Sequence, residues 1–186
     1  AATAKEDPLR LRLDANNGVI FLLNPKGEVA AYQGKQRLWE TKVTKHGLSS
    51  GVEAADGVVV VGNKKGQLFV LDQATGEQKW TAQLSGAIIS PALIQSGRVI
   101  VVANDGTVFA FDETTGQQAW TYKLANAQFS LRGQAAPVSI DPRTIVVATS
   151  NGYVYAIDSL TGVPRMQQRV AVSDGHSDIQ RLIGVD

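Results

Sequence analysis

The sequence predicts an all-β protein with the architecture of a β-propeller. Three observations support this: a motif that recurs at a spacing of about forty residues, strand and turn signals without a helical period, and strands that are apolar on both faces. A chain of 186 residues, of which 44% are hydrophobic and 19% charged, is long enough to bury a core. We therefore expect one domain made of repeated four-stranded antiparallel sheets, called blades.

The recurring motif reads glycine, five strand residues, aspartate, two free positions, Thr-Gly, three free positions and a large apolar residue. Three copies are strong, and a fourth, the first in the chain, has a turn that is two residues shorter. The copies begin at Gly27, Gly66, Gly106 and Gly152 and end at Trp39, Trp80, Trp120 and Met166. Their glycines are 39, 40 and 46 residues apart. We expect residues 1–186 to form a single partial propeller of about four blades that end near these large residues.

Each repeat is expected to form four strands, and the third repeat shows them most plainly. Turn signals at Ser96-Gly97, Asn104-Asp105-Gly106 and 112–116 separate short apolar runs, as in consecutive hairpins. The expected strands are 89–94, 98–103, 107–111 and 117–123.

The second strand of each strong repeat is apolar at consecutive positions, in 58–61, 99–102 and 145–148. A sheet with one wet face should instead alternate apolar and polar residues. Sheets that are buried on both faces and repeat along the chain indicate stacked propeller blades. A β-sandwich is the alternative, which explains the strands but not the regular repeat.

The repeated aspartates and tryptophans are predicted to be structural. Each aspartate lies four residues before a glycine, where its carboxylate can accept backbone N–H bonds and the glycine can adopt a positive φ. The aspartates are Asp72, Asp112 and Asp158, and the tryptophans are Trp39, Trp80 and Trp120. We expect each tryptophan to pack between adjacent blades, which leaves no tryptophan for a cofactor.

The composition excludes several functions. The net charge of +1 without a basic stripe argues against nucleic acid, and no apolar run approaches the length of a membrane span. The chain has no cysteine and only two histidines, His46 and His176, so neither a thiol nucleophile nor a histidine metal site is predicted. We therefore predict no catalytic residue, no metal and no cofactor.

The fourth repeat starts late because the connection that precedes it is long. Trp80 and Pro91 are 11 residues apart, whereas the corresponding Trp120 and Pro137 are 17 residues apart. A second long connection is predicted over 169–184. Consecutive interblade connections lie on the same rim of a propeller, so the loops 125–135 and 169–184 should lie side by side.

The first long loop carries Phe129, Leu131 and Arg132 with few charges around them. Aromatic, aliphatic and arginine side chains are favoured at protein interfaces. The alternative is that Phe129 and Leu131 pack the loop onto its own blade.

The repeat, from glycine through aspartate and Thr-Gly to tryptophan, resembles that of the PQQ-type propeller family, which includes pyrroloquinoline-quinone dehydrogenases and non-enzymatic scaffolds. Two loop motifs are more specific: LRGQAAP at 131–137 and SDIQRLIGVD at 177–186. They resemble the BamB family, the lipoprotein propellers of the β-barrel assembly machinery in Gram-negative outer membranes. The resemblance covers essentially the whole chain and implies the N-terminal half of an eight-bladed PQQ-type propeller.

The resemblance also implies a partner and a site. Family residues at the positions of Phe129, Leu131 and Arg132 engage a periplasmic POTRA domain of BamA, together with an acidic pair in the next long loop. That pair would fall at Gly184 and Asp186, and Gly184 departs from the pattern. Nascent outer-membrane proteins are a further expected partner.

By the same resemblance, the chain is expected to be a non-catalytic scaffold at the periplasmic face of the outer membrane. The family's lipid anchor is an N-terminal cysteine that this chain lacks, which implies a fragment starting downstream of it. The first alternative is a PQQ-dependent dehydrogenase domain, which the repeat alone also allows. The second is a propeller that binds a peptide or a sugar through the two long loops.

Half of a propeller would leave strand edges and sheet faces exposed. We therefore expect that the natural chain continues beyond Asp186 or that this fragment associates with itself.

Overall fold

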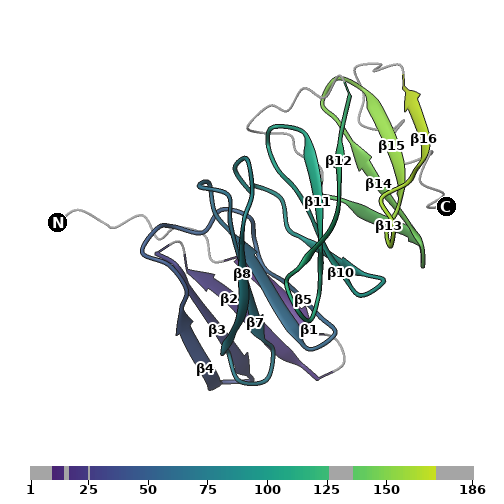
Figure 1. Cartoon of the computed structure of the whole chain (residues 1–186). Coiled ribbons are helices and arrows are strands. Elements are labelled where there is room, and N and C mark those ends of the chain that lie inside the picture. The colour runs from purple at the N-terminus through teal and green to yellow at the C-terminus, as the bar shows by residue number, and fades with distance from the viewer. Residues whose placement is uncertain (1–9, 15–16, 25, 126–135, 171–186) are drawn as a thin grey trace.

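The computed structural model describes residues 10–14, 17–24, 26–125 and 136–170. In these ranges the chain forms sixteen β-strands (Figure 1). The strands are β1 (Arg10–Asp14), β2 (Val19–Asn24), β3 (Glu28–Gln33), β4 (Gln36–Lys42), β5 (Glu53–Ala55), β6 (Val58–Gly62), β7 (Gln67–Asp72), β8 (Gln78–Gln83), β9 (Leu93–Gln95), β10 (Arg98–Val102), β11 (Thr107–Asp112), β12 (Gln118–Lys123), β13 (Val138–Asp141), β14 (Thr144–Ala148), β15 (Tyr153–Asp158) and β16 (Pro164–Arg169). A search of these described residues for a long apolar helix able to cross a membrane finds none.

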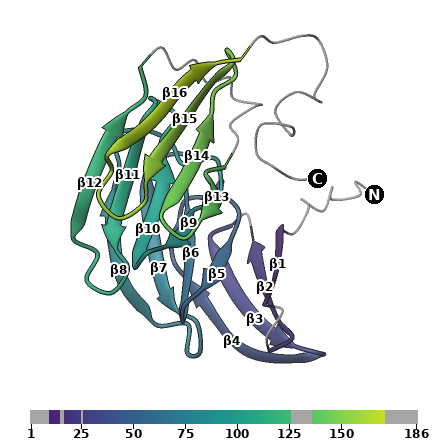
Figure 2. The same ribbon diagram turned by 90° about the vertical axis from the view of Figure 1, so that its right-hand side faces the viewer.

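The strands form four antiparallel sheets, β1–β4, β5–β8, β9–β12 and β13–β16, and the strand order within each sheet follows the chain. The four sheets, here blades 1 to 4, succeed one another from the first strands to the last (Figure 1 and Figure 2). The predicted four-stranded antiparallel blades are therefore confirmed, and a two-sheet sandwich is ruled out. The large residues that mark the repeats lie inside the last strand of each blade, β4, β8, β12 and β16.

The central strands are buried on both faces, as their sequence predicts. In β6, the side chains of Val58 and Val60 join a core between blades 2 and 3, and those of Val59 and Val61 join a core between blades 1 and 2. All four are at most 1% exposed. Burying a valine side chain stabilises the fold by about 1.5 kcal/mol or more, so these layers are the main source of cohesion between blades.

The first strand of blade 3 is shorter than predicted. The sequence predicts a strand over 89–94, whereas β9 covers only Leu93–Gln95. Pro91 has no N–H to donate to a ladder, and the segment before it pairs only through an isolated bridge between Ile88 and Ala103. The rest of the blade follows its predicted strands within one residue at each end.

The aspartate turns form as predicted. Asp72 Oδ1 accepts the backbone N–H groups of Ala74 and Thr75, both at 2.9 Å. Asp112 and Asp158 make the same pair of bonds in their own blades. The glycine at the end of each turn has a φ between 75° and 76°, the left-handed region that favours glycine.

Each tryptophan binds the aspartate turn of the next blade. The indole Nε1 of Trp39 donates to the carbonyl oxygen of Gln73 at 3.0 Å, and Trp80 and Trp120 donate to Glu113 and Ser159 at 2.9 and 3.0 Å. Each ring also lies against the glycine of that turn, so closely that a Cβ on Gly76 would approach the Trp39 ring to 2.4 Å. This contact fixes the distance and orientation between consecutive blades.

Two rims result from this arrangement. On one, the loop rim, the end of each last strand bonds to the repeat glycine, as in Leu124 N to Gly106 O at 2.8 Å and Val170 N to Gly152 O at 2.7 Å. On the other, the turn rim, the aspartate turn bonds to the first hairpin of its blade, as in Gln73 N to Gly57 O at 2.9 Å. Connections between blades leave from the loop rim, because the last strand of each blade ends there.

The outward face of blade 4 carries apolar side chains that are only partly covered. Met166, in the tryptophan position of this blade, is 44% exposed, and Val138 and Ile140 are 43% and 47% exposed. The adjoining cluster of Val146, Val154 and Ala156 corresponds to the surface through which blade 3 packs on blade 4. The outer face of blade 4 therefore has the composition of a seam between blades.

The glycine beneath each tryptophan gives a direct test of this packing. We expect Gly116→Ala to lower the free energy of unfolding by about 1–3 kcal/mol more than Gly97→Ala, because overpacking displaces the Trp80 ring. Both glycines have positive φ, but a Cβ on Gly116 would lie 2.5 Å from Trp80, whereas one on Gly97 meets nothing within 4 Å. Urea denaturation followed by tryptophan fluorescence measures both losses. Equal losses would contradict the proposed role of the contact.

Candidate functional site

The residues predicted to bind a partner, Phe129, Leu131, Arg132 and Asp186, lie outside the described residues. What the structure describes is the base from which each long loop leaves. That base determines which rim carries the loops and which residues support them.

The first long loop leaves blade 3 at an anchored point. Leu124 is 2% exposed and bonds to Gly106, so the end of β12 is held in the blade. At the next residue, the hydroxyl of Tyr155 donates to the carbonyl oxygen of Ala125. The chain is described again at Ala136 and reaches the buried Pro137 just before β13. The loop therefore begins at the anchored end of β12 and ends at a buried proline.

A cluster of three tyrosines lies at this base. The Tyr155 ring lies 6.4 Å from Tyr122 in an edge-on arrangement and 6.3 Å from Tyr153 in a stacked one, between ring centroids. The guanidinium of Arg169, at the end of β16, lies 5.9 Å from the Tyr153 ring centroid. Since the second long connection starts at this residue, the described starts of both connections meet at one cluster.

The environment of Tyr155 favours its hydrogen bond. Burial, and then its neighbours Tyr122 and Tyr153, raise the pKa of the Tyr155 hydroxyl above its usual value. The group therefore keeps its proton at neutral pH and acts as a donor to Ala125. Sequence reasoning missed this cluster, although three of the four tyrosines in the chain belong to it.

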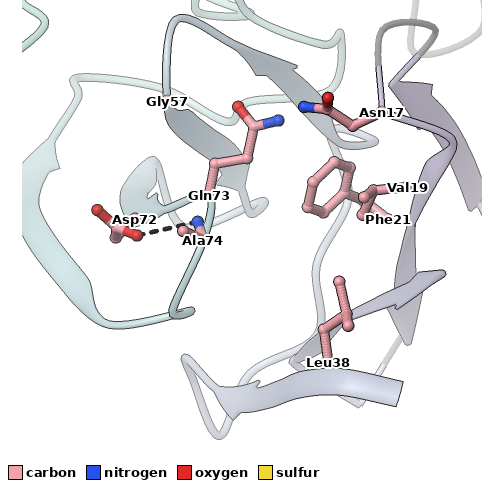
Figure 3. Close-up of a pocket in the computed structure, with 8 residues that line it drawn as sticks. All are labelled: Asn17, Val19, Phe21, Leu38, Gly57, Asp72, Gln73 and Ala74. Atoms are coloured by element: carbon pink, nitrogen blue, oxygen red, sulfur yellow. Dashed lines mark hydrogen bonds between the residues drawn. The ribbon is translucent and has the colours of Figure 1, made fainter. Parts of the chain in front are cut away.

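A second feature lies on the turn rim, between blades 1 and 2. It is a cavity of about 570 Å³ lined by Asn17, Val19, Phe21, Leu38, Gly57, Asp72, Gln73 and Ala74 (Figure 3). The side-chain amides of Asn17 and Gln73 point toward one another across it, and the Phe21 ring and Leu38 lie on the blade 1 side. Phe21 is fully buried, whereas Leu38 is 44% exposed at the edge. The cavity thus combines an apolar wall with two amides.

Asp72 contributes little charge to this cavity. Its carboxylate points away from the cavity and toward its own turn (Figure 3). The backbone N–H of Thr75 is the largest influence that holds the pKa of Asp72 below its usual value. The carboxylate is therefore ionised but occupied by turn N–H groups.

Within blade 4, Asp158 is the centre of a charged network. Its side chain accepts from Arg165 at 2.7 Å and from Arg143 at 3.1 and 3.2 Å, in addition to its turn N–H groups. The Arg165 hydrogen bond, followed by those of the Thr161 backbone and Arg143, lowers the pKa of Asp158 far below its usual range. Such a site stabilises a structural carboxylate and offers no proton donor at neutral pH.

Within the described ranges, no group of three or more histidine, aspartate or glutamate side chains could hold a metal ion. His46 is exposed, and its Nε2 lies 3.3 Å from Lys65 Nζ. His176 lies outside the described residues.

Comparison with known proteins places this repeat in one family. A family model described as outer membrane protein assembly factor BamB matches residues 25–185. The chain belongs to the BamB family. Its members include the assembly factor BamB of Xanthomonas campestris, which is 34% identical over 96% of this chain and 46% of the relative. BamB of Salmonella typhimurium is 40% identical over 75% of this chain and 35% of the relative.

The crystal structure of BamB from Moraxella catarrhalis has the same fold, with a TM-score of 0.77 and 31% identity over 90% of this chain and 49% of that chain. The chain thus spans less than half the length of these BamB relatives. A quinohemoprotein alcohol dehydrogenase from Comamonas testosteroni shares the fold, with a TM-score of 0.66, at 17% identity. That second likeness concerns architecture alone.

The Asp158 network predicts that the stability of blade 4 is sensitive to acid. Because the folded-state pKa of Asp158 is lowered, its contribution to stability is complete above about pH 4, the usual aspartate pKa, and is lost as the pH falls below it. We expect Asp158→Asn to destabilise the chain at pH 7 and to flatten its loss of stability between about pH 4 and 2.

Asp112→Asn is the matched control, because Asp112 has the same turn bonds but a single, longer arginine contact of 3.6 Å to Arg98. Its effect on the pH profile should be smaller. Thermal unfolding across this pH range measures both, and identical profiles for the two variants would refute the special role of the Asp158 network.

Proposed function

We propose that this chain is part of a non-catalytic accessory protein that assists the assembly and insertion of outer-membrane β-barrel proteins. The observation that carries the proposal is the BamB family match over residues 25–185. A second observation supports it: the carboxylates of Asp72, Asp112 and Asp158 accept hydrogen bonds from the N–H groups of their own turns, which is a structural role. The proposed location is the periplasmic face of the outer membrane, with the full-length protein attached by an N-terminal lipid.

The proposed partner surface is the loop rim of blades 3 and 4, and the proposed partner is a POTRA domain of BamA. Phe129, Leu131 and Arg132 would supply the apolar and cationic contacts, and Asp186 would supply an acidic one. Two described features support this assignment: the first loop is tied down at Ala125 and Pro137, and the second connection starts beside the same tyrosine cluster at Arg169. Loops held at their ends lose less conformational entropy when a partner binds.

Nascent outer-membrane proteins are a further proposed partner of the complete propeller. Since the chain spans 46% of the Xanthomonas relative, such binding could use surfaces that other blades provide. The loop rim of blades 3 and 4 is the part of the proposal that this chain can test by itself.

Substitutions in the first loop test the partner assignment. We expect Arg132→Ala and Leu131→Glu each to weaken binding of a BamA periplasmic fragment by about 2 kcal/mol or more, because each removes an interface anchor. Isothermal titration of the fragment with this chain measures the affinity.

Arg37→Ala is the matched control, because Arg37 is an exposed arginine on blade 1 that pairs only with the neighbouring Glu40 among its described ion pairs. The thermal midpoint of every variant should stay within a few degrees of that of the parent chain, which separates a loss of affinity from a loss of folding. Unchanged affinity in both loop variants would overturn the assignment.

A further inference from the structure

We propose that the cavity between blades 1 and 2 binds a bulky apolar side chain from an uncharged peptide segment. This site lies on the turn rim, opposite the loop rim proposed for the BamA contact. It would therefore give the protein a second binding surface that can be occupied while the first is engaged. The inference depends on the composition of the seam, which differs from those of the two seams that follow it.

The cavity is lined on the blade 1 side by the residue before the tryptophan, a position that varies between blades. That residue is Leu38 in blade 1 but Lys79 in blade 2. Across the seam, the residue after the turn aspartate is Gln73 in blade 2 but Glu113 in blade 3. The first seam thus has an uncharged pair where the second has a lysine and a glutamate.

The second seam carries charged side chains at the corresponding positions, Lys79 and Glu113. Burial raises the pKa of Glu113, nearby Asp56 raises it further, and Lys79 lowers it. The charges of Asp56 and Lys79 therefore act on the Glu113 carboxylate. Asp56 occupies in blade 2 the position that Asn17 occupies in blade 1. An apolar guest would therefore have to displace charges from the second seam but not from the first.

The third seam is closed by hydrogen bonds. Gln95 Nε2 donates to the carbonyl oxygen of Asp141 at 2.8 Å, and Ser96 Oγ donates to that of Pro142 at 2.9 Å. Arg98 Nε reaches the carbonyl oxygen of Leu160 at 3.4 Å. These bonds join the first hairpin of blade 3 to blade 4 across the position that corresponds to the cavity.

The lining of the first seam selects the chemistry of the guest. Val19 and Leu38 form an apolar wall, and the volume of about 570 Å³ lies within the usual range for ligand sites. The side-chain amide of Asn17 at the edge of the cavity can donate and accept, which suits the C=O and N–H groups of a peptide backbone. With Asp72 bonded to its own turn, a charged guest would lose hydration without gaining a partner.

The same lining disfavours a sugar. Carbohydrate recognition commonly uses the face of an exposed aromatic ring, but Phe21, which lines the cavity, is fully buried, and Trp39 is only 8% exposed. A peptide segment requires only the apolar wall for its side chain and the Asn17 amide for its backbone. We therefore commit to a peptide rather than a sugar as the occupant.

The walls of the cavity are held in place before any guest binds. Trp39 Nε1 bonds to the carbonyl oxygen of Gln73, and the backbone N–H of Gln73 bonds to the carbonyl oxygen of Gly57 at 2.9 Å. Gln33 Nε2 bonds to the carbonyl oxygen of Asn17 at 3.2 Å. Both amide-bearing residues thus have fixed backbones, which reduces the entropy lost on binding.

The test transplants the second seam into the first. The double variant L38K/Q73E introduces the pair found in Lys79 and Glu113, and A119K places a lysine at the corresponding position of blade 3 as a matched control. The probes are blocked pentapeptides of glycine and serine with a central phenylalanine, leucine, lysine or aspartate, and maltose serves as the sugar. Amide signals of Asn17 and Gln73 in two-dimensional NMR spectra report binding.

We expect saturable shifts with the phenylalanine and leucine peptides, and binding of the lysine and aspartate peptides that is weaker by about tenfold or more. L38K/Q73E should reduce binding of the apolar peptides by about tenfold, whereas A119K should leave it unchanged. Thermal midpoints near that of the parent chain would show that the variants remain folded.

Equal binding of charged peptides, preferential binding of maltose, no saturable shift, or full binding by L38K/Q73E would each overturn the inference. Arg132→Ala provides the separation from the proposed function. If this variant loses BamA binding but keeps peptide binding, the two sites are independent. If it loses peptide binding, the cavity is not the site.

Discussion

The contact between each tryptophan and the next aspartate turn sets the geometry of the whole chain. The indole N–H satisfies a turn carbonyl, and the ring occupies the space that only a glycine leaves open, as for Trp80, Glu113 and Gly116. The aspartate in turn holds the turn in shape by accepting two backbone N–H groups. Because the same set recurs in three seams, four small sheets stack as one curved row (Figure 2).

This regular packing separates the structural residues from those that remain available for binding. The repeated positions are committed to turns and seams, so the proposed binding surfaces use features that vary between blades. These features are the long connections on the loop rim and the uncharged pair Leu38 and Gln73, at free positions of the repeat, on the turn rim. The proposed partner surface corresponds to the first feature and the proposed peptide site to the second.

Much of the fold could be predicted from the sequence because its determinants recur in it. The positions of Trp39, Asp72 and their counterparts repeat along the chain, so aligning the copies shows which residues occupy equivalent positions in each blade. The short β9 was mispredicted, because the apolar run around Pro91 has strand-like composition but lacks a backbone donor. The Tyr155 bond to Ala125 joins residues 30 positions apart, and the cavity depends on which side chains meet across a seam, so neither was predicted.

Amide hydrogen exchange of this chain, with and without a BamA periplasmic fragment, tests the central claim most directly, namely that the loop rim of blades 3 and 4 is the partner surface. The account predicts slower exchange in 125–135 and 171–186 on binding, with little change in the aspartate turns 72–76 and 112–116 on the opposite rim. Protection confined to those turns, or none in either loop, would contradict it.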